Sequence, residues 1–341
     1  MKVALMERGR IWVDDQAVPE PGPGEVLVRT RACGICGSDL HAAQHTEDFV
    51  ATSRETGGAF KLTSFEPVVL GHEFCAELVD FGPDCARTAA PGQLVCSMPV
   101  LLREKPVSVG YDPNTPGGFS EYMRLSERLL LPVPQGTPAQ AAALTEPMAV
   151  GYHAVNKARL HGGETALVIG CGPVGLAVIT ALRAAGIGPL VAADYSVGRR
   201  NFALGQGATS LVDPAVENTF AATEVASADE LVVFECVGVP GMLDSVFAGV
   251  PPNTRIVVVG VCLQMDHARP LIAINKELNV QYVLGYTPKE FATSLKLIAD
   301  GSFDVAGLVT AQVGLDGVAS AFDELRSPDA HAKILVTPYR E

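Results

Sequence analysis

Residues 166–175 read Ala-Leu-Val-Ile-Gly-Cys-Gly-Pro-Val-Gly, an apolar run that ends in three closely spaced glycines. The run Ala166–Ile169 predicts a buried strand, and the glycines predict a tight turn that opens a helix. Backbone N–H groups in such a turn can approach a pyrophosphate at the positive end of the helix. The residues expected to form this cofactor-binding turn are Gly170, Gly172, Pro173, Val174 and Gly175.

An acidic residue follows this turn at the expected distance. Asp194 ends the next apolar run, where a carboxylate is expected to hydrogen-bond the ribose hydroxyls of the cofactor and to repel a 2′-phosphate. Arg199 and Arg200 lie nearby, and arginines in this region can accommodate NADP. The pattern favours NAD and leaves NADP as the alternative.

The rest of the chain divides into two patterns. Before residue 146, short strands are expected between Gly and Pro turns, and after it strands alternate with helices, which predicts a parallel sheet covered by helices on both faces. The expected strands are 26–31, 74–80, 94–97, 166–169, 190–193, 231–234 and 255–259, and the expected helices begin at Pro173, Ser196 and Pro288.

Length and charge narrow the function classes. A chain of 341 residues suggests two domains, and its net charge of -13 argues against a nucleic-acid partner, which needs a basic face. The apolar stretch 166–193 is broken by Arg183, glycines and prolines, so we expect no membrane span. Residues 1–15 carry no secretion signal, and the eight scattered cysteines do not suggest disulfides, so a cytoplasmic protein is expected.

A metal site is predicted by two short stretches of the sequence. They are 34–41 (Gly-Ile-Cys-Gly-Ser-Asp-Leu-His) and 71–73 (Gly-His-Glu). Catalytic zinc takes three protein ligands and keeps one position open, and thiolate, imidazole and carboxylate are suitable donors. One thiolate and one carboxylate neutralise Zn²⁺, so we expect two glutamates to alternate at the metal. The candidate ligands are Cys36, His72 and either Glu73 or Glu146.

These stretches, with Glu146-Pro147 and the glycine-rich turn in the same order, resemble the zinc-dependent medium-chain dehydrogenases, in particular the alcohol, polyol and threonine dehydrogenase branch. The resemblance implies hydride transfer between a neutral alcohol, secondary or polyol, and NAD. It also implies a Rossmann domain at 147–285, a discontinuous β-rich GroES-like catalytic domain at 1–146 and 286–341, and a homodimer or homotetramer. The second, structural zinc of many relatives is not expected, because residues 97–121 contain no cysteine.

The resemblance also assigns roles to single residues. Ser38 and His41 match a relay of hydroxyl, cofactor ribose and surface imidazole that carries the substrate proton away, and Lys333 matches a cation that reaches the pyrophosphate from the catalytic domain. Asp39 is expected to steady His72, since a ligating histidine usually gives its other N–H to a carboxylate. The strand ends expected to contact the ribose and nicotinamide are Val237, Gly238, Val259 and Gly260.

Several alternatives stay open at this point. A zinc-free reductase of the same superfamily, acting on enones or quinones, would need neither Cys36 nor His72. A nucleotide-binding module without catalysis, and a redox role for the Cys33-x-x-Cys36 pair, are less favoured. The segment 42–70 is longer than the ligand spacing requires, and we expect it to form a lid or binding loop, with a plain surface loop or a subunit contact as the alternatives.

Overall fold

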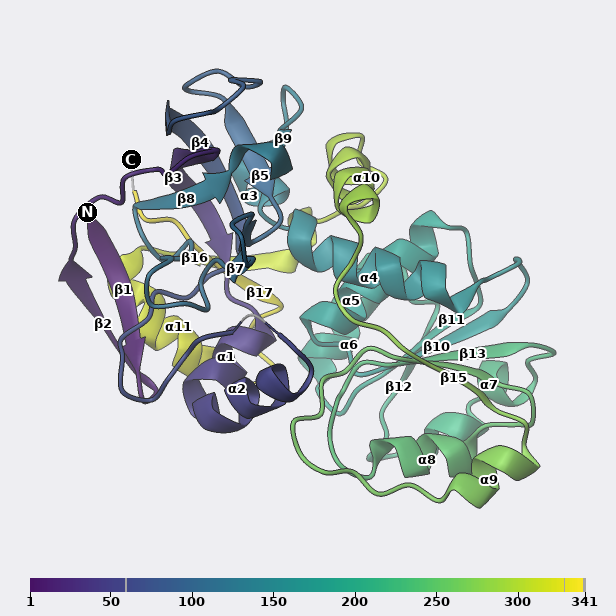
Figure 1. The fold of residues 1–341 in the computed structure, drawn as a ribbon. Coiled ribbons are helices and arrows are strands. Elements are labelled where there is room, and N and C mark those ends of the chain that lie inside the picture. Colours follow the sequence, from purple (N-terminus) through teal and green to yellow (C-terminus); the bar gives the residue numbers. More distant parts are fainter. Residues whose placement is uncertain (59, 328, 340–341) are drawn as a thin grey trace.

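Two units, one built on a mostly antiparallel sheet and the other on a parallel sheet, make up the computed structural model (Figure 1). The structure describes residues 1–58, 60–327 and 329–339. Both chain ends that Figure 1 marks belong to the first unit, and the second unit is formed by the middle of the chain. Within the described residues no helix has the length and apolarity needed to cross a bilayer.

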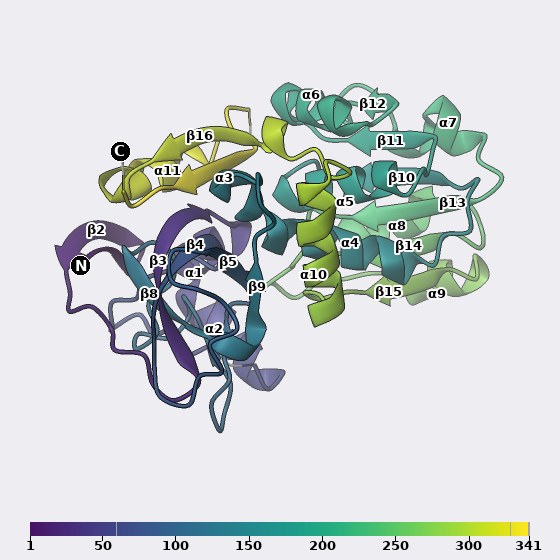
Figure 2. The same cartoon turned by 90° about the horizontal axis from the view of Figure 1, so that it is seen from above.

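The second unit contains six parallel strands in the order β12-β11-β10-β13-β14-β15, which Figure 2 shows from top to bottom. Its first strand, β10, therefore lies in the middle of the sheet, which is the arrangement of dinucleotide-binding folds. Ile169 pairs with both Ala193 and Glu235, so the carboxyl ends of the three central strands meet at one edge. The strands are β10 (Thr165–Ile169), β11 (Leu190–Ala193), β12 (Ser210–Val212), β13 (Leu231–Glu235), β14 (Arg255–Val258) and β15 (Asn279–Tyr282).

Helices cover both faces of this sheet because side chains of a strand alternate between its faces. Ala166 and Val168 of β10 join one core with α4 and α5, while Leu167 and Ile169 join another with α8. This confirms the predicted doubly wound α/β domain. The helices are α4 (Thr145–Ala158), α5 (Pro173–Ala184), α6 (Val197–Gln206), α7 (Thr223–Ala226), α8 (Met242–Gly249), α9 (Pro270–Asn275) and α10 (Pro288–Ala299), with the 3-10 turns η2 (Thr219–Ala221) and η3 (Ala306–Leu308).

The first unit is built on a seven-stranded sheet in which β3 is the central strand and pairs with β17, β4 and β8. The sheet strands are β3 (Glu25–Gly34), β4 (Glu73–Phe81), β5 (Leu94–Ser97), β8 (Tyr122–Ser126), β9 (Leu130–Pro132), β16 (Val309–Val313) and β17 (Lys333–Val336). Two hairpins lie around this sheet, β1 (Lys2–Glu7) with β2 (Arg10–Asp15) and β6 (Val100–Leu101) with β7 (Val107–Ser108). The helices of this unit include α3 (Ala139–Ala142) and α11 (Val318–Glu324), and its 3-10 turns are η1 (Glu127–Leu129) and η4 (Leu315–Gly317).

The chain passes from the first unit to the second in α4 and rejoins the first sheet at β16 and β17. The fold class expected from the sequence, a Rossmann domain with a discontinuous β-rich domain, is therefore confirmed. The domain limits at 146/147 and 285/286 stay predictions.

The long segment between the two ligand stretches is more ordered than a polar loop. It forms α1 (Gly37–Gln44) and α2 (Thr46–Glu55), and Phe49 and Val50 of α2 are buried. Glu47 and Asp48 lie in the first turn of α2, where negative side chains stabilise a helix. Ala59, which belongs to the same segment, lies outside the described residues.

Candidate metal and cofactor site

The pairing of β3 with β4 brings the two ligand stretches together. Gly34, the last residue of β3, lies directly opposite Glu73, the first residue of β4. A Cβ atom at position 34 would lie 2.0 Å from Glu73 Oε2, so the close approach of the two strands requires glycine here. Cys36 then follows as the residue that precedes α1.

Cys36, His72 and Glu73 offer ligand atoms that all lie within 4.8 Å of one another. His72 and Glu73 are buried and Cys36 is partly exposed, so an ion would be enclosed on the protein side and accessible on the other. A thiolate, an imidazole and a carboxylate at this separation fit the donor set of a catalytic zinc. The residues present therefore fit the metal that the sequence predicts.

Asp39 organises two of these ligands. Its Oδ1 lies 3.2 Å from His72 Nδ1, an ion-pair distance without the alignment of a hydrogen bond, and its Oδ2 accepts the backbone N–H of Cys36 at 2.9 Å. Burial opposes protonation of His72, but Asp39 and Cys36 outweigh it and hold the His72 pKa well above its ordinary value. A metal ion must therefore displace a proton from this ring.

Lys333 is hydrogen-bonded to a metal donor and also borders the cavity that Pro173 of α5 lines, so its expected contact with the pyrophosphate stays a prediction. Its buried Nζ donates to Glu73 Oε1 at 2.8 Å, to Glu73 Oε2 at 2.7 Å and to the carbonyl of Ile35 at 3.1 Å. The cause is the sheet register, because β17 pairs with the end of β3. Burial lowers the pKa of Lys333, but the charges of Glu73 and Cys36 outweigh it and hold the pKa above its ordinary value.

Glu146 lies in the first turn of α4, outside the group of three donors but within its electrostatic reach. Burial raises the pKa of Glu146 to about 7, and Glu73 adds to this, while His72 and a hydrogen bond from Tyr286 act in the opposite direction. The structure gives Glu146 no ion-pair partner of its own among the described residues, so its carboxyl group is free to bind a metal ion held by the three donors.

The relay residues stand where α1 begins. Ser38 Oγ lies 3.3 Å from His72 Nε2 and accepts a hydrogen bond of 2.9 Å from the hydroxyl of Tyr111. His41 is half-buried one turn further along, and burial together with the neighbouring His45 lowers its pKa. A neutral His41 can accept a proton near pH 7.

The glycine-rich turn lies across from this site, at the start of α5. Gly172 precedes the helix and Pro173 is its first residue. A Cβ atom at Gly175 would lie 1.9 Å from the carbonyl oxygen of Gly170, so the helix can only approach the strand end with glycine at this position. The turn therefore has the close packing that pyrophosphate binding needs.

Asp194 and the two arginines are arranged around the same turn. Asp194 accepts the backbone N–H groups of Cys171 and Ser196, each at 2.8 Å. Arg200 is bound to the carbonyl of Asp194 and pairs with Asp213 at 2.9 Å, whereas Arg199 extends over Gly172. Arg200 is thus already engaged, and Arg199 points to the glycine-rich turn.

The strand ends expected near the ribose and nicotinamide lie side by side. The backbone N–H groups of Val259 and Gly260 donate to the carbonyl of Glu235, and its side chain accepts the N–H groups of Val237 and Gly238. Glu235 is 2% exposed, and burial raises its pKa. This buried carboxylate fixes the shape of the cofactor-facing edge.

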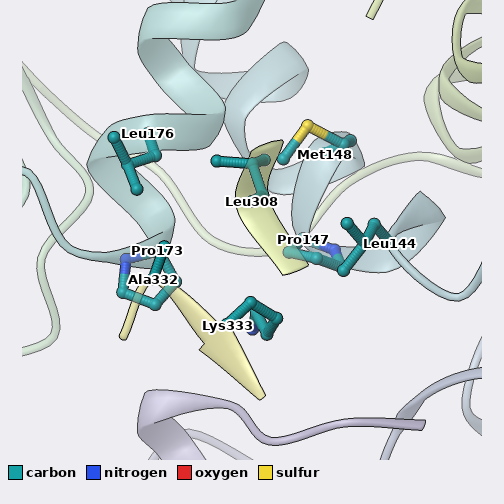
Figure 3. Close-up of a pocket in the computed structure, with 8 residues that line it drawn as sticks. All are labelled: Leu144, Pro147, Met148, Pro173, Leu176, Leu308, Ala332 and Lys333. Carbon is teal, nitrogen blue, oxygen red and sulfur yellow. The ribbon is translucent and has the colours of Figure 1, made fainter. Parts of the chain in front are cut away.

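A small apolar cavity lies between the two units (Figure 3). Lys333 of β17, Pro147 of α4 and Pro173 of α5 face it from three elements, so the metal-site lysine and the start of the pyrophosphate helix border the same space. The metal and cofactor sites are therefore adjacent across the junction.

Comparison with known proteins agrees with this geometry. Residues 22–135 match the alcohol dehydrogenase GroES-like domain, and residues 173–300 match the zinc-binding dehydrogenase family. The (R,R)-butanediol dehydrogenase of Bacillus subtilis (strain 168) is 33% identical over 334 residues, 94% of each chain. The chain belongs to the zinc-type medium-chain dehydrogenase superfamily. The family and the enzyme class predicted from the sequence are therefore confirmed. The predicted cofactor classes, zinc and a nicotinamide dinucleotide, are confirmed as well.

This dehydrogenase is also similar to the sorbitol dehydrogenase of Bos taurus, at 28% identity over 92% of this chain and 90% of the relative. A crystal structure of 2R,3R-butanediol dehydrogenase from Bacillus subtilis superposes with a TM-score of 0.85 at 30% identity over 99% of both chains. A dehydrogenase from Sinorhizobium meliloti 1021 with NADP bound superposes at 0.84, with 26% identity over 99% of both chains. At least one protein that is similar to this chain thus holds NADP.

Sequence reasoning missed several side chains of the dehydrogenase site. Tyr111 and Tyr286 contact Ser38 and Glu146, respectively, from segments without any metal-binding pattern. Glu235 was overlooked although it directly follows the predicted strand 231–234 and ends the observed strand β13, and a charged residue at the end of an apolar run is a signal that could have found it.

Proposed function

We propose that this dehydrogenase transfers a hydride between a neutral alcohol and NAD, with the ketone as product. The observation that carries the proposal is the Cys36, His72 and Glu73 donor group facing the glycine-rich turn across the junction of the units. A secondary alcohol or polyol is favoured, and the names of the butanediol and sorbitol dehydrogenase relatives support this choice.

Cys36 and His72 would hold the zinc ion, with Glu73 as the proposed third ligand. Glu146 would be the alternative third ligand. When bound, zinc supplies Lewis acidity toward the substrate oxygen. Lys333 offsets the charge of Glu73, so both glutamates can be ionised beside the metal without leaving the site with a net negative charge. This cation weakens the charge argument for strict alternation of the two glutamates.

Ser38 and His41 would handle the proton of the alcohol. Ser38 Oγ lies 3.3 Å from His72 Nε2 and can accept the substrate proton while its own proton passes outward along the proposed relay of hydroxyl, cofactor ribose and His41. Burial and the neighbouring His45 lower the pKa of His41, which keeps its ring neutral near pH 7 and leaves a ring nitrogen free to take up the proton.

NAD is the proposed dinucleotide. Asp194 is placed at the strand end beside the turn, where its charge disfavours a 2′-phosphate, and Arg200 is neutralised by Asp213. Lys333, which borders the same cavity as Pro173, is proposed to reach the pyrophosphate, and Arg199, whose guanidinium lies beside Gly172, is proposed to assist it.

The substrate is proposed to be uncharged. Among the described residues that contact the donor group, Lys333 is the lysine or arginine side chain, and both carboxylate oxygens of Glu73 accept hydrogen bonds from it. A carboxylate or phosphate on the substrate would therefore meet Glu73 and Glu146 without a free cationic partner. Strong activity confined to anionic substrates would contradict this.

The deciding experiment is to measure bound zinc and NADH formation over a panel of secondary alcohols and polyols. One zinc per chain with activity that a chelator removes supports the proposal. Activity that persists without zinc, on enones or quinones, favours the zinc-free reductase, and NAD binding without turnover favours a nucleotide-binding module.

A homodimer or homotetramer is proposed through the free edge of the parallel sheet. Tyr282 of β15 is 62% exposed and Leu284 just beyond it 88%, and Leu271 and Ile274 of α9 are exposed beside them. An unpaired strand edge with an apolar border is suited to pairing with a second copy.

A cytoplasmic location is proposed because all eight cysteines are free thiols.

A further inference from the structure

An aromatic cluster connects the segment 42–70 to the metal site. Phe49 of α2 and Phe60 stack with ring centroids 5.0 Å apart and planes at 6°. Tyr111 lies 5.7 Å from the first ring and 4.5 Å from the second, and its own ring lies 5.1 Å from that of His72. The inserted segment therefore reaches a metal ligand through one tyrosine.

The hydroxyl of this tyrosine is aimed at Ser38. Tyr111 is 5% exposed, and its Oη lies 2.9 Å from Ser38 Oγ and 3.4 Å from Asp39 Oδ1. A phenolic hydroxyl is protonated near neutral pH, so Tyr111 acts as the donor in this contact. The shorter distance makes Ser38 the main acceptor.

We propose that Tyr111 is a positioning residue whose hydroxyl donates to Ser38 Oγ and fixes the direction in which Ser38 accepts and releases the substrate proton, and that Phe49 and Phe60 hold the Tyr111 ring for this purpose. The proposal rests on the proposed alcohol dehydrogenase function. It gives the inserted segment a role in turnover in addition to any role in substrate preference.

The physical argument concerns the single hydrogen and two lone pairs of the Ser38 hydroxyl. The hydrogen bond from Tyr111 occupies one lone pair, and the other, which lies beside His72 Nε2 in the metal-free protein, is left for the substrate hydroxyl when His72 serves as a metal ligand. When the substrate O–H bond breaks, a new O–H bond forms at Ser38 Oγ and the original serine O–H bond breaks, its proton passing outward along the proposed relay that ends at His41. Release of the serine proton ahead of its replacement puts negative charge on Oγ, which the Tyr111 donor stabilises.

Tyr111→Phe tests the hydroxyl alone, because the ring and its stacking are kept. We expect kcat for alcohol oxidation to fall about tenfold with KM within about twofold, since the bond strengthens only as charge develops. Zinc content and the Kd for NAD should be unchanged. An unchanged kcat would overturn the proposal.

Ser38→Ala and the double variant separate positioning from general structure. If Tyr111 acts through Ser38, adding Tyr111→Phe to Ser38→Ala causes no further loss of kcat. Independent, multiplying losses would show that Tyr111 acts by another route.

The aromatic support is tested with Phe60→Leu. This variant should lower kcat, as Tyr111→Phe does, and should cause no further loss of kcat when it is combined with Tyr111→Phe. Phe65→Leu is the matched control, because Phe65 belongs to the same segment but is 72% exposed and outside the cluster. Equal effects of both leucine variants would assign the loss to the segment in general and overturn the role of the cluster.

The hydrogen bond can also be measured without metal or cofactor. In the metal-free protein, Tyr111→Phe and Ser38→Ala should shift the denaturant midpoint non-additively, because each removes one partner of the same bond. Additive shifts would overturn the contact. A wild-type protein without zinc-dependent alcohol oxidation would refute the proposed function, whereas an active wild type with a silent Tyr111→Phe refutes only this inference.

Discussion

Single residues in the metal site combine two chemical tasks. Glu73 contributes an oxygen to the donor group and at the same time neutralises Lys333, which is buried with it. Removal of either partner would leave an unpaired buried charge, a costly arrangement. Substitutions at these two positions therefore affect folding as well as metal binding, and Cys36 is the cleaner position for a test of the metal.

Cys36→Ser is expected to remove bound zinc and alcohol oxidation while leaving the Kd for NAD nearly unchanged. The thiolate is the soft donor of the set, and the glycine-rich turn belongs to the other unit. Metal analysis, turnover and NAD titration check this, with Cys262→Ser as the control from outside the donor group. An active, zinc-free Cys36→Ser protein would contradict the proposed mechanism.

Asp194→Ala should weaken NAD binding by roughly tenfold and reduce the preference for NAD over NADP, because a charged hydrogen-bond acceptor and the repulsion of a 2′-phosphate are both lost. Kinetics with both dinucleotides check the outcome. Asp229→Ala, at an exposed position of the same unit, is the control. A wild type with the higher kcat/KM for NADP would already refute the NAD assignment.

The donor residues could be found from the sequence because each lies in a short stretch whose spacing reflects local geometry. Cys36, His72 and the glycine-rich turn are of this kind. Lys333 and Tyr111 could not be placed, since their contacts depend on strand pairing and ring packing between segments far apart in the chain. The ion pair of Lys333 with Glu73 was not predicted for this reason, and the contact of Lys333 with the pyrophosphate stays a prediction.

At the scale of elements, strand ends and helix starts decide where the chemistry lies. The carboxyl ends of β10, β11 and β13 form the cofactor edge, and the end of β3 with the start of β4 forms the metal edge. Short apolar or alternating runs between Gly and Pro turns predicted these strands. The helix α2 was missed because a polar stretch with only two buried apolar side chains gives little periodic signal.

The free edge at β15 leads to a prediction about assembly. Leu284→Glu should shift the protein from dimer or tetramer toward monomer, because a charge is placed in the apolar border of the unpaired strand. Light scattering at micromolar concentration measures this. Leu204→Glu, on the exposed side of α6, is the matched control, and a wild type that is monomeric at that concentration would contradict the proposed interface.

At the scale of the whole molecule, one ion pair joins several elements of the cofactor unit. Arg255 at the start of β14 donates to Glu164 beside β10 at 2.6 Å and to the carbonyls of Ala158 and Arg159 at the end of α4. Burial alone would raise the pKa of Glu164, but Arg255 and backbone N–H groups lower it to about 2. The carboxylate is thus stabilising only in its charged form.

Glu164→Gln should therefore cost about 2 kcal/mol of unfolding free energy at pH 7. Because the folded pKa is depressed, this contribution is complete above the ordinary pKa of 4.5 and is lost as the pH falls toward about 2. Denaturant unfolding of wild type and variant across this range should show the two curves converging in acid. Glu217→Gln, an exposed position, should show no such convergence, and a pH-independent difference for Glu164→Gln would contradict the assignment.

The contact between Lys333 and Glu73 spans 260 positions of the chain. At a synthesis rate of roughly 5 to 20 residues per second, the ribosome produces Glu73 roughly 13 to 50 s before it produces Lys333. During that interval β3 and β4 can pair, but the glutamate beside the metal ligands lacks its cation. The ion pair beside the metal ligands can therefore form only after β17 has been synthesised and has joined the first sheet.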